Sequence, residues 1–248
     1  MTQIARAQGM QRQFDEAHRT LDEADAMIDS DMHRARARLL LERGRVFKSS
    51  GSADKAKPLF IKAWQLASGE GIDGLAVDAA HMVAIFEVGE KALKWNHKAL
   101  DLANSSSDPD AQRWKGSLCN NIGWAHHSNG DYDKALTYFE QALQHRQAQG
   151  KADGIRIARW CIARCLRSLD RMEEALAIQR EMEQQIADTE NPDGYVYEEL
   201  GECLHALGRT DEAKPSFRRA HELLSKDAWL VESEPQRIER LGELGKGS

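Results

Sequence analysis

Small and apolar residues recur along this chain with the spacing of packed α-helices. The pattern is clearest in residues 120–143, where Gly130 separates two helix-forming stretches. In the second stretch, Ala135 and Ala142 are seven positions apart with Phe139 between them. Two small residues around one large ring let neighbouring helices approach closely, so this segment predicts an antiparallel helix hairpin.

The second-helix pattern recurs along the chain with a spacing of about 40 residues. A helix hairpin buries its apolar face only when a neighbour stacks on it, so this period predicts a solenoid. The leading alanines of six units follow one another after 39, 36, 43, 40 and 38 residues: Ala17, Ala56, Ala92, Ala135, Ala175 and Ala213. Small residues lie 12 positions before four of them, at Gly44, Gly123, Ala163 and Gly201.

These residues resemble the tetratricopeptide repeat, most specifically in residues 120–143. The resemblance extends over residues 1–226 and implies an all-α fold, a right-handed α-solenoid of about six antiparallel helix hairpins. The period exceeds the 34 residues of the standard repeat, which implies extended helices or longer linkers. Residues 227–248 are expected to supply a capping helix, with Trp229 and Leu230 over the last hairpin, and a flexible tail.

Two features depart from a regular array. Around Ala92, the residues Val88, Gly89 and Glu90 leave little room for the usual turn, so we expect a local change of geometry there. Long connections are expected at residues 103–110 and 188–194, where polar and turn-forming residues separate the helical stretches.

The composition favours a helical protein with ample apolar surface to bury, because 41% of the 248 residues are hydrophobic and 30% are charged. The net charge of -6 argues against the broad basic surface of a nucleic-acid-binding protein. The sequence has no apolar run long enough for a membrane span, and its start has no apolar signal-peptide core. We therefore expect a cytoplasmic protein with neither nucleic acid nor membrane as a partner.

No catalytic motif of useful specificity is present, so we expect a protein that is not an enzyme and that holds no metal or cofactor. Adjacent His126 and His127 point about 100° apart on a helix and cannot converge on one ion. His81 lies among apolar residues, and we expect its ring to be satisfied by a carbonyl group or by Asp78. The four cysteines are expected to be small buried thiols: Cys119, Cys161, Cys165 and Cys203.

In tetratricopeptide arrays the first helix of each hairpin lines a concave groove, and the resemblance implies the same arrangement here. Residues 154–169 contain four arginines and no acid, and arginine suits bidentate recognition of carboxylates. The chain is therefore predicted to be an interaction scaffold that binds an acidic or carboxylate-bearing peptide of a partner protein. The candidate groove residues are Arg45, Lys48, Asn120, Trp124, His127, Trp160, Arg164 and Arg167.

Four alternatives remain open at the level of sequence. The arginines of residues 154–169 could instead pair with Glu198, Glu199 and Glu202 of the next unit and hold the stack together. The chain could be a regulatory module whose superhelix changes shape with a peptide or small ligand. It could self-associate through its end units, for example as a homodimer. An enzyme would have to rely on scattered histidines and cysteines.

Overall fold

A computed structural model describes residues 1–186 and 192–246. In these residues the regular secondary structure is α-helical and contains no strand, so the predicted all-α fold class is confirmed. The chain divides into two compact units, Met1–Ala125 and His126–Ser248. The boundary falls inside one helix, α8 (Lys115–Ser128).

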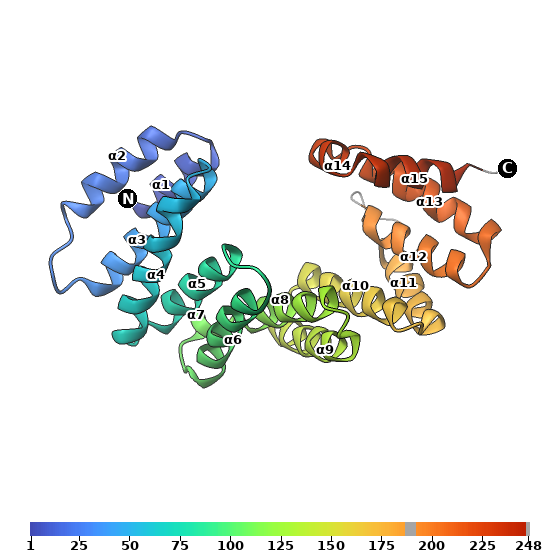
Figure 1. Ribbon diagram of the computed structural model, residues 1–248, viewed down its shortest axis with the longest axis horizontal. Helices are drawn as coiled ribbons and strands as arrows, with labels where there is room; N and C mark the ends of the chain where they lie inside the picture. The colour runs from blue at the N-terminus through green and yellow to red at the C-terminus, as the bar shows by residue number, and fades with distance from the viewer. Residues whose placement is uncertain (187–191, 247–248) are drawn as a thin grey trace. The chain divides into compact units, whose positions relative to one another are not determined.

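The first unit is built from helix hairpins in which consecutive helices pack against each other (Figure 1). In order along the chain, its helices before α8 are α1 (Thr2–Met10), α2 (Phe14–Asp25), α3 (His33–Ser49), α4 (Ala53–Gly69), α5 (Asp73–Ile85), α6 (Gly89–Ser105) and the short α7 (Pro109–Gln112). The odd-numbered helix α3 also contacts both α1 and α5, and these three helices are called the inner layer of this unit.

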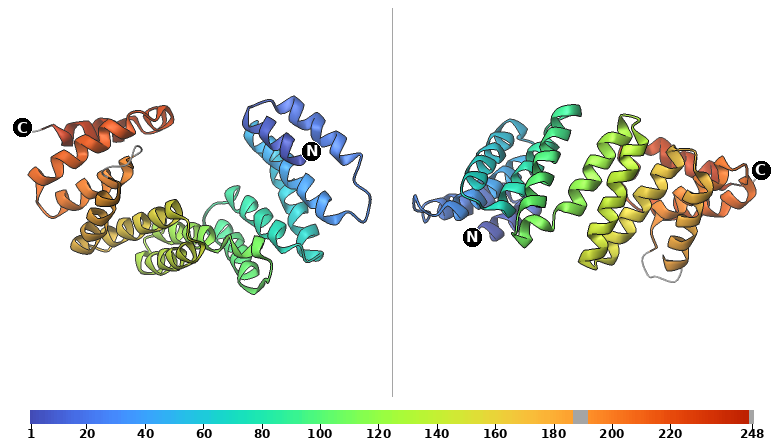
Figure 2. Two further views of the ribbon diagram at one scale, coloured as in Figure 1. Left: turned by 180° about the vertical axis from the view of Figure 1, so that it is seen from behind. Right: turned by 90° about the horizontal axis from the view of Figure 1, so that it is seen from below.

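The second unit continues the same arrangement, and its neighbouring helices lie side by side in both views of Figure 2. The helices after α8 are α9 (Tyr132–Gln149), α10 (Ala152–Ser168), α11 (Met172–Ile186), α12 (Gly194–Ala206), α13 (Thr210–Leu224), α14 (Ala228–Ser233) and α15 (Pro235–Gly245). Here α10 contacts α12 directly, while α15 packs against α13.

Close approach within a hairpin is made possible by glycine opposite an aromatic ring. A Cβ atom added at Gly44 of α3 would lie 2.6 Å from the ring of Phe60 on α4, and one at Gly201 of α12 would lie 2.8 Å from Phe217 on α13. Both rings are buried, Phe60 completely. In the hairpins that carry alanine in place of this glycine, a smaller side chain replaces the ring: Ala5 with Leu21, Ala80 with Asn96, and Ala163 with Gln179.

Gln179, like Asn96, is therefore an amide in a position that the other four hairpins give to an apolar group. Its side chain has no exposed surface, and among the described residues neither its oxygen nor its nitrogen has a hydrogen-bond partner. A buried polar group without a partner costs about 1–3 kcal/mol. This cost offsets part of the stabilisation that the packing of α11 on α10 provides.

The turn inside most hairpins requires one residue with a positive φ, five positions before the leading alanine. Glycine supplies it at Gly51, Gly130 and Gly208, whereas Arg12 and Asp170 adopt φ values of 64° and 60°. Such values cost a non-glycine residue about 1–2 kcal/mol.

The hairpin of Ala92 differs from the others in the conformation of its turn and not in the length of its turn. Its link from α5 to α6 is as long as that from α3 to α4, but the positive φ belongs to Gly89, the first residue of α6.

The predicted long connection at residues 103–110 is partly helical and is anchored to α5. The α6 helix continues to Ser105, and Asp108 accepts a hydrogen bond from the backbone N–H of Asp110 at 2.8 Å, which caps α7. The other carboxylate oxygen of Asp108 accepts from the N–H of Gly74 at 3.0 Å. Of the second predicted connection, residues 188–191 lie outside the described residues, and α12 begins at Gly194.

The C-terminal helices α14 and α15, in the region where a cap was expected, bury apolar side chains of their own. Leu230 and Leu241 have no exposed surface, and Ile238 is 8% exposed. Trp229, by contrast, is 68% exposed, so the expectation that it covers the last hairpin was wrong. Neighbouring helical residues point about 100° apart, and burying Leu230 turns Trp229 outward. Of the predicted flexible tail, residues 247–248 lie outside the described residues.

The contact between Gly44 and Phe60 predicts a specific loss of stability. Gly44→Ala is expected to lower the free energy of unfolding by about 1–3 kcal/mol, because the new methyl group overlaps the ring. The matched control is Gly69→Ala, at a helical glycine with no atom within 4 Å of an added Cβ. It is expected to leave the unfolding free energy unchanged or raise it by about 0.5–1 kcal/mol. Chemical denaturation measures both values, and equal losses would contradict the role of the ring.

Candidate functional site

A hollow of about 330 Å³ opens on the inner layer of the first unit, between α1, α3 and α5. Gly9 of α1 permits the close approach of α1 to α3, since an added Cβ would lie 3.3 Å from Val46 Cγ2. Two of the groove residues predicted from the sequence, Arg45 and Lys48, line this hollow. The hollow is also lined by Arg6, Met10, Met82 and Ile85.

The hollow has an apolar wall that is open to solvent. Met10 is 79% exposed and Ile85 is 48% exposed, whereas Val46 and Met82 beneath them are buried. Apolar side chains of this size are normally turned into the core, and exposed ones beside a hollow are typical of an interaction surface. Sequence reasoning missed Met10, Met82 and Ile85 because it searched for charged and aromatic residues. The available signal was the apolar residue that ends α1, Met10, and the one that ends α5, Ile85.

Arg45 is fixed by acids beneath the hollow. Its Nη1 donates to Glu42 Oε1 at 2.8 Å, and its Nη2 donates to Asp78 Oδ1 at 2.5 Å. Glu42 has no exposed surface and also accepts from Arg6 Nη1 at 3.4 Å. These bonds join α1 to α3 and α3 to α5. The guanidinium of Arg45 is thus used mainly to hold the inner helices together.

Lys48 also lines the hollow, but unlike Arg45 it is not paired with an acid in the described residues. Its side chain is exposed, and the residues described by the structure offer it no ion pair. With Arg45 held by Glu42 and Asp78, the ammonium group of Lys48 gives the hollow a surplus positive charge at its edge. An incoming carboxylate would meet this charge beside an apolar wall.

His81 lies on α5 next to this network. Burial lowers its pKa; Arg45 and Lys48 act in the same direction, and Asp78 opposes them. Its Nδ1 lies 3.3 Å from Asn121 Nδ2 of α8, so its hydrogen-bonding partner is an amide and not the expected carbonyl group or Asp78. The imidazole therefore joins the next pair of inner helices.

In the second unit, two predicted groove residues meet at Ser168. His127 Nε2 lies 2.9 Å from Ser168 Oγ, and Arg164 Nη1 donates to the same oxygen at 2.8 Å. Burial lowers the pKa of His127, and Arg164 and Arg167 lower it further. The imidazole is accordingly kept neutral beside two guanidinium groups.

The arginines of α10 are paired within the unit, as the alternative interpretation of the sequence predicted. Arg167 donates to both oxygens of Glu199 at 2.5 and 3.2 Å, and Arg164 Nε lies 3.7 Å from the same carboxylate. Glu199 is 3% exposed. The remaining pairs differ from that prediction, since Glu198 and Glu202 bind Arg237 and Arg240 of α15. Arg156 pairs with Asp153 and Asp193, and Arg159 pairs with Glu181.

The predicted tryptophans are not equivalent in the structure. Trp160 donates from Nε1 to the carbonyl oxygen of Tyr195 at 3.0 Å and meets the Tyr195 ring edge-on. Asn120 and Trp124 are half-buried on the part of α8 that belongs to the first unit. The predicted cluster of Trp124, Trp160 and the arginines is thus divided between the two units.

The cysteines have the character of packed thiols. All four are buried. Burial raises the pKa of Cys119 and Cys165 to about 11 and that of Cys203 to about 12, so these thiols are poor nucleophiles. Within residues 1–186 and 192–246, no group of three His, Cys, Asp or Glu side chains is arranged to hold a metal ion.

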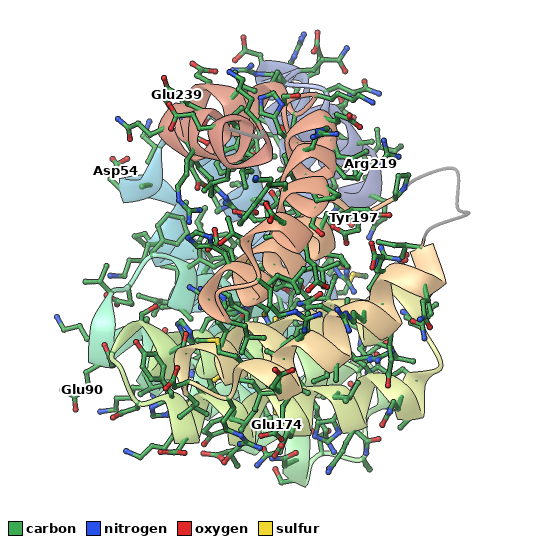
Figure 3. The ribbon with its side chains drawn as sticks, turned by 90° about the vertical axis from the view of Figure 1, so that its right-hand side faces the viewer. Asp54, Glu90, Glu174, Tyr197, Arg219 and Glu239 are labelled. Atoms are coloured by element: carbon green, nitrogen blue, oxygen red, sulfur yellow. The ribbon has the colours of Figure 1, made fainter. Side chains whose placement is uncertain are left out.

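The buried pair of α10 and α12 predicts a large effect of one substitution. Glu199→Gln is expected to lower the unfolding free energy by about 1–3 kcal/mol, because two partly buried guanidinium groups lose their carboxylate. Glu174→Gln is the matched control, since Glu174 accepts a bidentate pair from Arg171 at 2.7 Å but lies at the surface (Figure 3). It should cause no measurable loss in chemical denaturation. Equal losses would show that burial of the pair has no effect.

The environment of His127 predicts a titration below the ordinary histidine pKa of 6.5. Arg164→Gln should raise this pKa toward 6.5, while Arg219→Gln, an exposed arginine of α13, should leave it unchanged. NMR titration of the imidazole measures both. Because the unfolded chain binds this proton more tightly, the contribution of His127 to stability is present above pH 6.5 and is lost as the pH falls below it. A pKa at or above 6.5 in the unmodified protein would contradict this environment.

No helix in the described part of the chain combines the length and the apolar character that a membrane crossing requires. A comparison with curated proteins gives no match. Among solved structures, the apo form of RapI is similar with a TM-score of 0.67 and 13% identity, covering 98% of this chain and 73% of RapI. BtubC (BKLC) from P. vanneervenii gives a TM-score of 0.64 at 17% identity, covering 96% and 93% of the two chains.

NprR in complex with its cognate peptide NprX is similar with a TM-score of 0.58 and 14% identity, covering 98% of this chain and 70% of NprR. At these identities the likeness concerns the fold alone. The sequence itself is matched by three models of the tetratricopeptide repeat, over residues 79–148, 120–194 and 195–223. The matches together span residues 79–223, which is more than half of the chain, and the predicted resemblance is confirmed. The protein belongs to the tetratricopeptide repeat family.

Proposed function

We propose that this protein is an interaction scaffold whose hollow between α1, α3 and α5 binds a segment of a partner protein. The observation that carries the proposal is the exposed apolar wall of Met10 and Ile85 beside the uncompensated charge of Lys48. Membership of a family of helical repeats agrees with this function. The similar protein NprR was solved with a peptide bound, which supports a peptide-sized ligand for this fold.

The size and lining of the hollow favour a short segment with one apolar anchor. About 330 Å³ is at the lower end of the range for ligand pockets, so one large side chain and its neighbouring backbone fill it. Burying such a side chain stabilises a complex by about 1.5–3 kcal/mol. The thioethers of Met10 and Met82 adapt to different shapes, so the anchor can be aliphatic or aromatic.

Charge favours an acidic segment, as the sequence predicted, and among the predicted groove residues it favours Lys48 over the arginines. Arg164 and Arg167 face Glu199, and Arg45 faces Glu42 and Asp78. A ligand carboxylate that displaced one of these acids would leave a buried charge unpaired, which is costly. Lys48 can bind the carboxylate without such a loss, because no acid of the protein has to be displaced. The proposed groove is therefore centred on Lys48 and Ile85 in the first unit.

Substitution of Ile85 tests the proposal. Peptides selected from a displayed random library on the full-length protein are expected to carry an apolar residue next to an acid. Ile85→Asp should weaken their binding at least tenfold, a loss of about 1.4 kcal/mol, because a carboxylate then occupies the apolar wall. Fluorescence anisotropy of the labelled peptides measures this change.

Two matched controls accompany this experiment. Ile157→Asp alters an isoleucine of almost equal exposure, 46% against 48%, outside the hollow and should leave peptide binding unchanged. Lys48→Glu should weaken the acidic peptides, while Lys151→Glu, at another exposed lysine, should not. If no peptide is enriched, or if enriched peptides bind the Ile85 and Ile157 variants equally, the proposed site is wrong.

A further inference from the structure

The short helix α14 presents a tryptophan to solvent in a fixed position. Leu230 has no exposed surface and anchors the helix, while Asp227 accepts hydrogen bonds from the N–H groups of Trp229 and Leu230 at 3.0 and 3.2 Å. Trp229 itself is 68% exposed, and Val231 is 39% exposed. A large apolar side chain held outward on an anchored helix, with no cover in the described residues, is typical of a binding anchor.

A carboxylate accompanies this tryptophan on the same face of α14. Glu232 follows Trp229 by three positions, a spacing that places two helical side chains next to each other. Glu232 is exposed and has no ion pair among the residues that the structure describes. The face therefore combines one large apolar group with one negative charge, about one helical turn apart.

The hollow of the first unit has the complementary combination. Its wall exposes Met10 and Ile85, its floor contains Met82, and its surplus charge is the ammonium group of Lys48. Thioether sulfurs make favourable contacts with aromatic rings, which suits an indole as the anchor. Opposite charges at the edge of an apolar contact fix its orientation.

We propose that α14 of one copy of the protein docks in the hollow of a second copy. Trp229 then contacts Met10, Met82 and Ile85, and the carboxylate of Glu232 lies near Lys48. The inference rests on the proposed function of the hollow as a binding site and names its occupant. Because the two surfaces differ, the contact is head-to-tail, so that successive copies either close into a ring or add to an open chain. Self-association and the binding of a partner segment therefore compete for one site.

Sedimentation velocity of the full-length protein over a range of concentrations tests this contact. The average mass is expected to rise with concentration. Trp229→Ala and Ile85→Asp should each raise the dissociation constant at least about thirtyfold, the effect of losing one central anchor. Ile157→Asp should sediment like the unmodified protein. Circular dichroism confirms in each case that the helical content is kept.

Mixing two variants tests the head-to-tail geometry. The Trp229→Ala copy retains an intact hollow, and the Ile85→Asp copy retains an intact α14. The mixture should therefore form a 1:1 dimer that does not grow further, although each variant alone is monomeric. A charge exchange gives a second test: Lys48→Glu and Glu232→Lys should each weaken association, and their combination in one chain should restore it.

The outcomes separate this inference from the proposed function. A monomer at all concentrations, association that is insensitive to Trp229→Ala, or a mixture that forms no dimer would overturn the inference. If selected peptides still bind the hollow in an Ile85-dependent manner, the proposed function stands without it. If neither peptides nor a second copy depend on Ile85, both are wrong.

Discussion

The close contact between a small residue on the first helix of a hairpin and a large side chain on the second is the constraint on which the rest of the structure depends. Gly44 and Gly201 allow the rings of Phe60 and Phe217 to lie against the backbone of the facing helix. Packed interiors tolerate little change in volume, so alanine at the first position goes with a smaller partner, such as Leu21. This contact fixes the distance within each hairpin, and it thereby determines which face of each first helix remains for the inner layer.

The charges of the inner layer are used first to join its helices. In the first unit, Arg6 and Arg45 bind acids of the following inner helix, and in the second unit Arg167 binds Glu199. The acids are almost completely buried, and removing one would leave a partly buried guanidinium group unpaired. A ligand can therefore use only the charge that this network leaves over. Among the described residues that line the hollow, Lys48 has no ion pair, and it lies where apolar side chains are also exposed.

One hollow that accepts either a partner segment or a second copy would make the assembly state of the protein sensitive to its partners. Ligands that compete for one site lower each other's apparent affinity in proportion to their concentrations, without any change of conformation. A partner segment that occupies the hollow would release α14 of the neighbouring copy. The Trp229 and Ile85 surfaces would then connect binding to assembly through simple competition.

The sequence by itself determined the family and the class of fold. Its repeated alanines, glycines and rings are local signals, and each marks a helix or a turn whatever lies around it. The positive φ of Arg12 and Asp170 was invisible to a search for glycine, although both residues stand at the same place in their hairpins as Gly51. Only the tertiary structure decided which side chains are available for binding. The arginines of residues 154–169 formed a basic run in the sequence, but folding places Glu199 and Glu181, distant in the chain, against three of them. Met10 and Ile85 are of residue types that are normally buried, and helix packing leaves both exposed. Charge neutralisation and burial depend on which residues become neighbours across helices, and that is decided by packing and not by local sequence.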